Sequence, residues 1–166
     1  TQYGLAKQIS VSNQEALDFI NAYFKKFPEI KDYMEKTIKF CKKNGYVNNN
    51  FGRRIHLRGI NDKNFSVRSF QERAAINAPI QSSAADIIRL AMIKIDDLIN
   101  SNKIYKAKML LQIHDELVFE CQKSNQKNVE KIVKKTMESV SSSDYHMFKI
   151  PLDVNVNSGN NWDEAH

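Results

Sequence analysis

The sequence has few of the residues that mark several common protein classes. Only two of its 166 residues are cysteines, Cys41 and Cys121, and neither lies in a CxxC pair. This spacing indicates neither a zinc site nor a disulfide framework, and it favours a reducing, intracellular compartment. No apolar run approaches the roughly 18 residues of a membrane span, and the polar start lacks the layout of a signal peptide. We therefore expect no membrane partner.

Glycine and proline are also scarce, whereas basic residues are abundant. Five glycines and three prolines, beside a hydrophobic share of 42%, argue against extended disorder. The net charge of +6 and the sequence pI near 9.2 favour an anionic partner such as nucleic acid. Many lysines, such as Lys36 and Lys39, lie in helical stretches, where a solvated face is the simpler explanation.

Apolar spacing predicts a mainly helical first part of the chain. Ser12 with Glu15, and Ser83 with Asp86, are capping-box pairs that open helices. Gly45 suits a helix C-cap, and Pro79 is expected to end the helix that precedes it. The helices are expected at residues 1–9, 12–24, 29–44, 65–78, 83–98 and 125–140.

Short strands are expected between and after these helices. Residues 46–47 and 55–57 flank a polar, glycine-bearing loop that suits a hairpin. A second hairpin, of about 108–113 and 116–121, flanks the dipeptide His114-Asp115, and residues 151–156 alternate as a final strand. The pattern predicts an α+β fold with long helices, two hairpins and a C-terminal strand.

The turn of the second hairpin carries candidate chemistry. Such turns usually contain Asn-Gly or Gly-X, so His-Asp runs against local preference. Asp115 and Glu116 place two carboxylates together, and carboxylate oxygens suit Mg²⁺. The alternative is that Asp115 simply favours a turn, and the residues alone leave that open.

A polar series precedes and follows Pro79. Arg73, Asn77 and Gln81 are spaced four apart, so the first two share a helix face. Arginine and amide side chains can donate to the acceptors of the DNA minor groove, which scarcely depend on sequence. Small alanines around them, among them Ala75, would let a groove come close. A solvated helix stripe is the alternative.

Two longer stretches carry a family resemblance. ERAAINAPIQ, from Glu72 to Gln81, and QIHDELVFE, from Gln112 to Glu120, closely resemble signature stretches of family A DNA polymerases, the family of bacterial DNA polymerase I. Residues 51–54, 84–88 and 161–166 also look like that family, in the same order. Ser82-Ser83, where the family commonly has Gly-Thr, is a local departure.

The resemblance implies a palm and fingers fragment of a DNA polymerase domain. It implies that residues 1–100 form a mainly helical fingers-to-palm part, and residues 101–166 the palm hairpin, a helix and the final strand. It also implies that Asp115 is a ligand of the two catalytic Mg²⁺ ions, that Glu116 supports the site, and that His114 lies near the primer end. By the same resemblance, Arg73, Asn77 and Gln81 contact primer-template DNA.

The implied activity is template-directed DNA synthesis from dNTPs in replication and repair. The location expected is the bacterial cytoplasm, at the nucleoid, or an organelle. A second metal-binding aspartate and a nucleotide-gripping helix would lie upstream, so we expect this chain to be an inactive fragment that self-associates. A non-catalytic DNA-binding module is the alternative function, and a single-subunit RNA polymerase is a further one.

Overall fold

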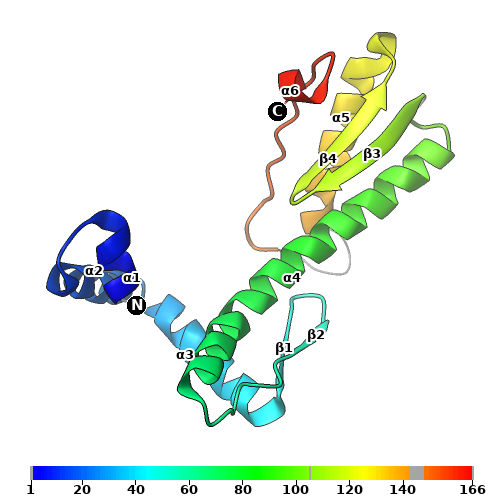
Figure 1. Cartoon of the computed structure of the whole chain (residues 1–166). Coiled ribbons are helices and arrows are strands. Elements are labelled where there is room, and N and C mark those ends of the chain that lie inside the picture. The colour runs from blue at the N-terminus through cyan, green and yellow to red at the C-terminus, as the bar shows by residue number, and fades with distance from the viewer. Residues whose placement is uncertain (1, 105, 143–147, 166) are drawn as a thin grey trace. The chain divides into compact units, whose positions relative to one another are not determined.

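The chain has an α+β fold dominated by helices, as the sequence predicts. The computed structural model describes residues 2–104, 106–142 and 148–165 (Figure 1). The chain divides into two compact units, Thr1–Val47 with Arg54–Ala78 and Asn48–Arg53 with Pro79–His166. Within the described residues, no helix is both long and apolar enough to cross a membrane.

The first unit begins with three helices, α1 (Gln2–Ile9), α2 (Asn13–Lys26) and α3 (Pro28–Asn44). The predicted capping box opens α2. The Glu15 backbone N–H donates to Ser12 Oγ over 3.2 Å, and the Ser12 N–H donates to Glu15 Oε2 over 2.9 Å. These two bonds satisfy amide groups that a helix start otherwise leaves without partners.

The end of α3 leads directly into the first hairpin. Gly45 has φ 77°, a left-handed conformation that glycine adopts without steric cost, and its N–H donates to the Cys41 carbonyl. Strands β1 (Tyr46–Asn48) and β2 (Arg54–His56) then pair, as predicted. Cys41 and Val47 are buried in the core of this unit together with Leu57, Ile60 and Ala75.

The prediction that a helix ends near Pro79 was wrong. One helix, α4 (Phe65–Asn100), runs through Pro79. Pro79 has no N–H for the carbonyl four residues before it, but proline does not force a helix to end when neighbouring groups compensate. The carbonyl that loses its donor is that of Ala75, whereas the Ser83 hydroxyl donates to the carbonyl of Pro79 itself over 2.6 Å. Ser83 is therefore a mid-helix residue rather than an N-cap.

The second hairpin consists of β3 (Ala107–Ile113) and β4 (Glu116–Cys121), close to the predicted bounds. The strands are antiparallel, from Ala107 opposite Cys121 to Ile113 opposite Glu116, with a bulge between Met109 and Leu111. Helix α5 (Gln126–Ser139) runs alongside the hairpin (Figure 1). The core between them and the end of α4 contains Ile95, Ile104, Ala107, Val129 and Val133.

Short helical turns complete the second unit. They are η1 (Lys123–Asn125), η2 (Val140–Ser142) and α6 (Trp162–Ala165). The predicted strand at Pro151–Val156 is not formed: this segment is not paired with any described strand. The predicted alternation is present, because Leu152 and Val154 are half-buried between exposed neighbours. An extended segment forms a strand, however, only when a neighbouring strand exchanges backbone hydrogen bonds with it.

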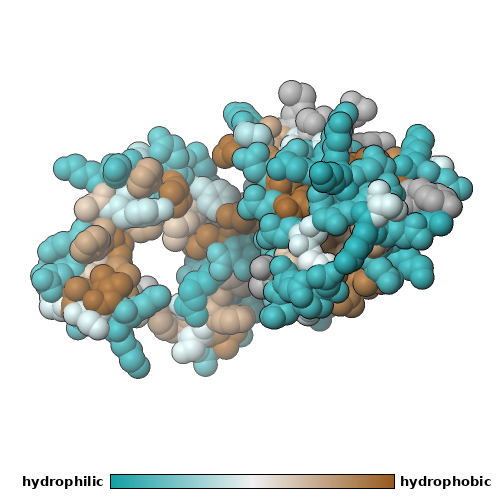
Figure 2. Space-filling model, turned by 90° about the horizontal axis from the view of Figure 1, so that it is seen from above, coloured by the Kyte–Doolittle hydropathy of each residue, from teal (hydrophilic) through white to brown (hydrophobic). Residues whose placement is uncertain are grey.

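Apolar side chains also reach the surface of both units. Hydrophilic groups cover most of the visible face, with apolar groups between them (Figure 2). In the first unit Tyr3 and Phe19 are exposed, and in the second Leu110 and Leu111 of β3 are about half exposed.

Candidate metal and nucleic-acid site

The turn of the β3–β4 hairpin holds the candidate catalytic residues. His114 has φ 51°, a left-handed conformation that costs a non-glycine residue roughly 1 kcal/mol. Its carbonyl accepts a hydrogen bond from Gln112 Nε2 over 2.6 Å, and the flanking residues Ile113 and Glu116 are paired. Both strands therefore hold the turn in place. The positive φ of His114 agrees with the expectation that His-Asp is an unfavourable sequence for such a turn.

The carboxylates of this turn point to solvent rather than into the core. Asp115 and Glu116 are both exposed, as is His114. Mg²⁺ typically takes one or two carboxylates from a protein and its other ligands from water and substrate phosphates, so the pair suits a partial magnesium site. Among the residues that the structure describes, no group of three or more His, Cys, Asp or Glu side chains could hold a metal ion.

The candidate DNA contacts are exposed along α4. Arg73 and Asn77 belong to the first unit and Gln81 to the second, and all three side chains lie at the surface. Arg73 Nη1 donates to Ser69 Oγ over 2.8 Å, which uses one of its five N–H donors and leaves others for a ligand. Ala75 does not open this face to a groove, because it is fully buried in the first unit's core.

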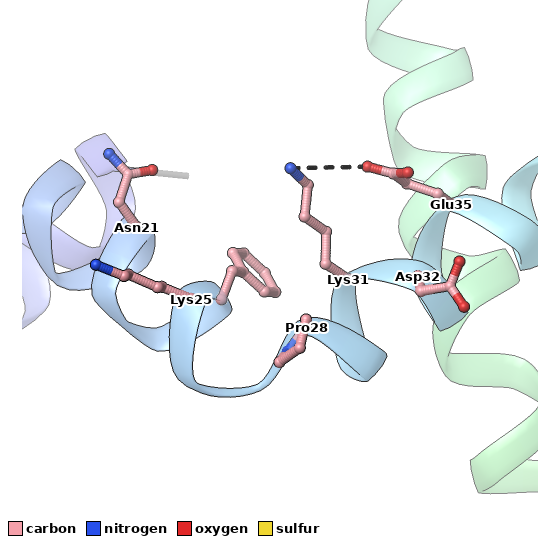
Figure 3. Close-up of a pocket in the computed structure, with 7 residues that line it drawn as sticks. Asn21, Lys25, Pro28, Lys31, Asp32 and Glu35 are labelled. Carbon is pink, nitrogen blue, oxygen red and sulfur yellow. Dashed lines mark ion pairs between the residues drawn. The ribbon is translucent and has the colours of Figure 1, made fainter.

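The first unit has a hollow of about 450 Å³ that none of the candidate residues lines. It is lined by side chains of α2 and α3, including Lys25, Lys31, Asp32 and Glu35 (Figure 3). Lys31 Nζ and Glu35 Oε1 form an ion pair across 3.9 Å on its rim, and both are well exposed. Charges of both signs line it and none of the candidate residues does, so it contributes nothing to the site.

Comparison with known proteins shows the family. The model of DNA polymerase family A matches residues 1–164. The chain belongs to this family. The family A assignment covers both units and therefore both the α4 residues and the hairpin turn.

Three relatives are similar over nearly the whole chain. DNA polymerase I of Rhizobium leguminosarum is 46% identical and that of Caldicellulosiruptor bescii 42% identical, each over 99% of this chain. The POL domain of Pol1 from M. smegmatis, solved in complex with DNA primer-template and dNTP, superposes with a TM-score of 0.90 at 39% identity and 99% coverage. The chain spans 16% and 19% of the two relatives and 28% of the solved chain.

The structure of this family A chain also contains an ion cluster, centred on the buried carboxylate of Asp86, that the sequence did not reveal. The Asp86 side chain, only 8% exposed, accepts from Arg53 Nε over 2.9 Å and from Arg53 Nη2 over 2.8 Å. Asn49 Nδ2 and Arg89 Nη1 donate to the same carboxylate over 2.7 and 3.0 Å. The hydrogen bonds from Arg53 lower the pKa of Asp86 more than burial of the carboxylate raises it. The carboxylate is therefore ionised at neutral pH.

The prediction that Asp86 caps a helix is wrong, and the sequence contains a signal against it. Asp86 lies in an apolar part of α4, between Ala85 and Ile87, where a buried charge needs a partner. The adjacent arginines after the turn glycine, Arg53 and Arg54, were candidates for that partner. Their distance in sequence hid the pairing.

Proposed function

We propose that this chain is part of a DNA-directed DNA polymerase. The reaction is attack of a primer 3′-hydroxyl on the α-phosphorus of a dNTP, which breaks the bond to the β-phosphate and releases pyrophosphate. The observation that carries the proposal is the exposed turn that bears Asp115 and Glu116 in a chain of family A. Paired strands hold this turn on both sides. A metal ligand must be exposed to substrate and held in place, and this turn meets both conditions.

Asp115 is the residue that we assign as a Mg²⁺ ligand, with Glu116 supporting it. Two bound Mg²⁺ ions would align the hydroxyl and the triphosphate and stabilise the charge that develops during transfer. Two carboxylates cannot complete such a site, so other parts of the parent protein supply the remaining ligands. His114 is assigned to the vicinity of the primer end.

The α4 residues are assigned to the DNA. Arg73, Asn77 and Gln81 are exposed donors, and donors of this kind can read minor-groove acceptors that differ little between base-pair orders. Residues 1–100 are assigned to the fingers-to-palm part and 101–166 to the palm. We place the parent protein in the bacterial cytoplasm, at the nucleoid, or in an organelle, where DNA is replicated and repaired.

Template copying by the full-length parent protein tests the proposal. We expect extension of a labelled primer in an order set by the template, dependent on Mg²⁺ and abolished by EDTA. A control primer without template should not be extended. Binding of primer-template without any incorporation would instead support a non-catalytic DNA-binding module, and incorporation of ribonucleotides in preference would support an RNA polymerase.

Replacing Arg73 by alanine in the parent protein tests the groove contact. We expect Arg73→Ala to raise the Kd for primer-template about tenfold, because a hydrogen bond from a charged donor is lost. The loss should be similar for unrelated sequences, measured by fluorescence anisotropy. Lys131→Ala, which removes one exposed positive charge from α5, is the control and should have a much smaller effect. A strong template preference in the Arg73 variant would contradict minor-groove contacts.

A further inference from the structure

A cluster of side chains fastens the β1–β2 loop onto α4 within the second unit. We call it the Asp86 cluster, and its members are Asn49, Arg53, Ser82, Ser83, Asp86 and Arg89. Asp86 is its centre, with four donated hydrogen bonds on one buried carboxylate. Charge-assisted bonds of this kind are stronger than neutral ones, and the paired Arg53 bonds also fix direction.

The loop itself is built to present these groups. Asn49 Oδ1 accepts from the backbone N–H groups of Phe51 and Arg53, each over 2.9 Å. Gly52 has φ 78°, which lets the chain reverse within the loop. The side-chain amide of Asn49 is thereby fixed at both of its polar atoms. Its oxygen accepts from the loop backbone, and its nitrogen donates to side chains of α4.

The cluster holds α4 directly after Pro79, where the helix lacks one backbone hydrogen bond. Pro79 donates no backbone hydrogen bond, so the turn around it depends on other contacts. Ser83 Oγ donates to the Pro79 carbonyl and accepts from the Asn50 N–H over 3.0 Å. Ser82 Oγ accepts from Asn49 Nδ2 over 2.9 Å. The loop therefore fixes the residues just after the proline.

Gln81 lies inside this fixed segment, between Pro79 and Ser82, with its side chain exposed. We propose that the Asp86 cluster positions Gln81 for its contact with primer-template DNA, with Asp86 and Arg53 as positioning residues. The inference rests on the proposed function, because Gln81 matters here only as a DNA contact. By holding the backbone around Gln81, the cluster would restrict the orientations of the Gln81 side chain in the free protein. The side chain then loses less conformational entropy when it contacts DNA.

A double-mutant cycle in the full-length parent protein tests this. We expect Gln81→Ala to raise the primer-template Kd about tenfold and Asp86→Asn about fivefold, measured by fluorescence anisotropy. In the Gln81→Ala background, Asp86→Asn should add less than about twofold, because its effect passes through Gln81. A role in general stability alone would give equal losses in both backgrounds, and that result would overturn the inference.

The matched control is Asp96→Asn on the same helix. Asp96 is exposed and accepts only a local hydrogen bond from Asn100 Nδ2 among the bonds described, so its replacement should leave the Kd unchanged in both backgrounds. Should Asp86→Asn lower the yield of folded protein, the cycle is run with Arg53→Gln. That change removes the guanidinium bonds and leaves Asp86 with Asn49 and Arg89.

Two further results separate this inference from the proposed function. An unchanged Kd for Gln81→Ala would overturn the positioning of Gln81, while template copying by the unmutated parent protein would still support polymerase activity. An unchanged Kd for Asp86→Asn would overturn the role of the cluster and leave the assignment of Gln81 intact.

Discussion

Asp115→Asn in the full-length parent protein is expected to reduce single-turnover nucleotide incorporation by about a thousandfold or more. The change keeps the size of the side chain and removes its negative charge, so it weakens a metal ligand whose contribution is several kcal/mol in the transition state. DNA affinity should change little, because Asp115 is not among the residues assigned to the groove. Rapid-quench incorporation, measured beside primer-template Kd, separates the two effects.

Glu120→Gln is the control for this experiment. Glu120 is an exposed carboxylate on β4 of the same hairpin, away from the turn, and its neutralisation should leave incorporation close to normal. Near-normal incorporation by Asp115→Asn would show that the metal-ligand assignment is wrong. Parallel loss of incorporation and of DNA affinity would show that the substitution disturbs the hairpin as a whole.

The elements that could be predicted from the sequence are those with local causes. The capping box of Ser12 and Glu15 and the left-handed Gly45 each depend on a few neighbouring residues, and the structure confirms both. The β3–β4 hairpin was also predictable, since two apolar runs flank a polar dipeptide, and Asp115 lies at its exposed turn as expected. Local rules therefore located the candidate turn before its surroundings were known.

The failures have non-local causes. Helix α4 continues through Pro79, and hydrogen bonds from the distant β1–β2 loop hold the two serines that follow, Ser82 and Ser83. Residues 151–156 have the alternation of a strand but no strand partner among the described residues. Asp86 is not a cap but the partner of Arg53, which lies 33 positions earlier. At Pro79 and Asp86 the contacts come from residues far away in sequence, and at 151–156 the described residues provide no strand partner.

The 166-residue chain assayed alone is expected to show no template-dependent extension. Its described residues bring no third metal-binding side chain to Asp115 and Glu116, and it spans only 16% of its Rhizobium relative. Misplacing reactants by about 1 Å can cost on the order of 100-fold in rate, so an incomplete ligand set should leave nothing measurable. The net charge of +6 should still give DNA binding that weakens steeply as salt rises.

Primer extension by rigorously purified chain, with the full-length parent protein as positive control, checks this expectation. Circular dichroism should first show that the isolated chain is helical, so that inactivity is not mistaken for unfolding. Light scattering would reveal self-association, which we expect because apolar side chains such as Leu110 and Leu111 are exposed on β3. Extension that follows the template and disappears with Asp115→Asn would mean that the isolated chain assembles a working site by itself, and the proposal of ligands supplied by other parts of the parent would then fail.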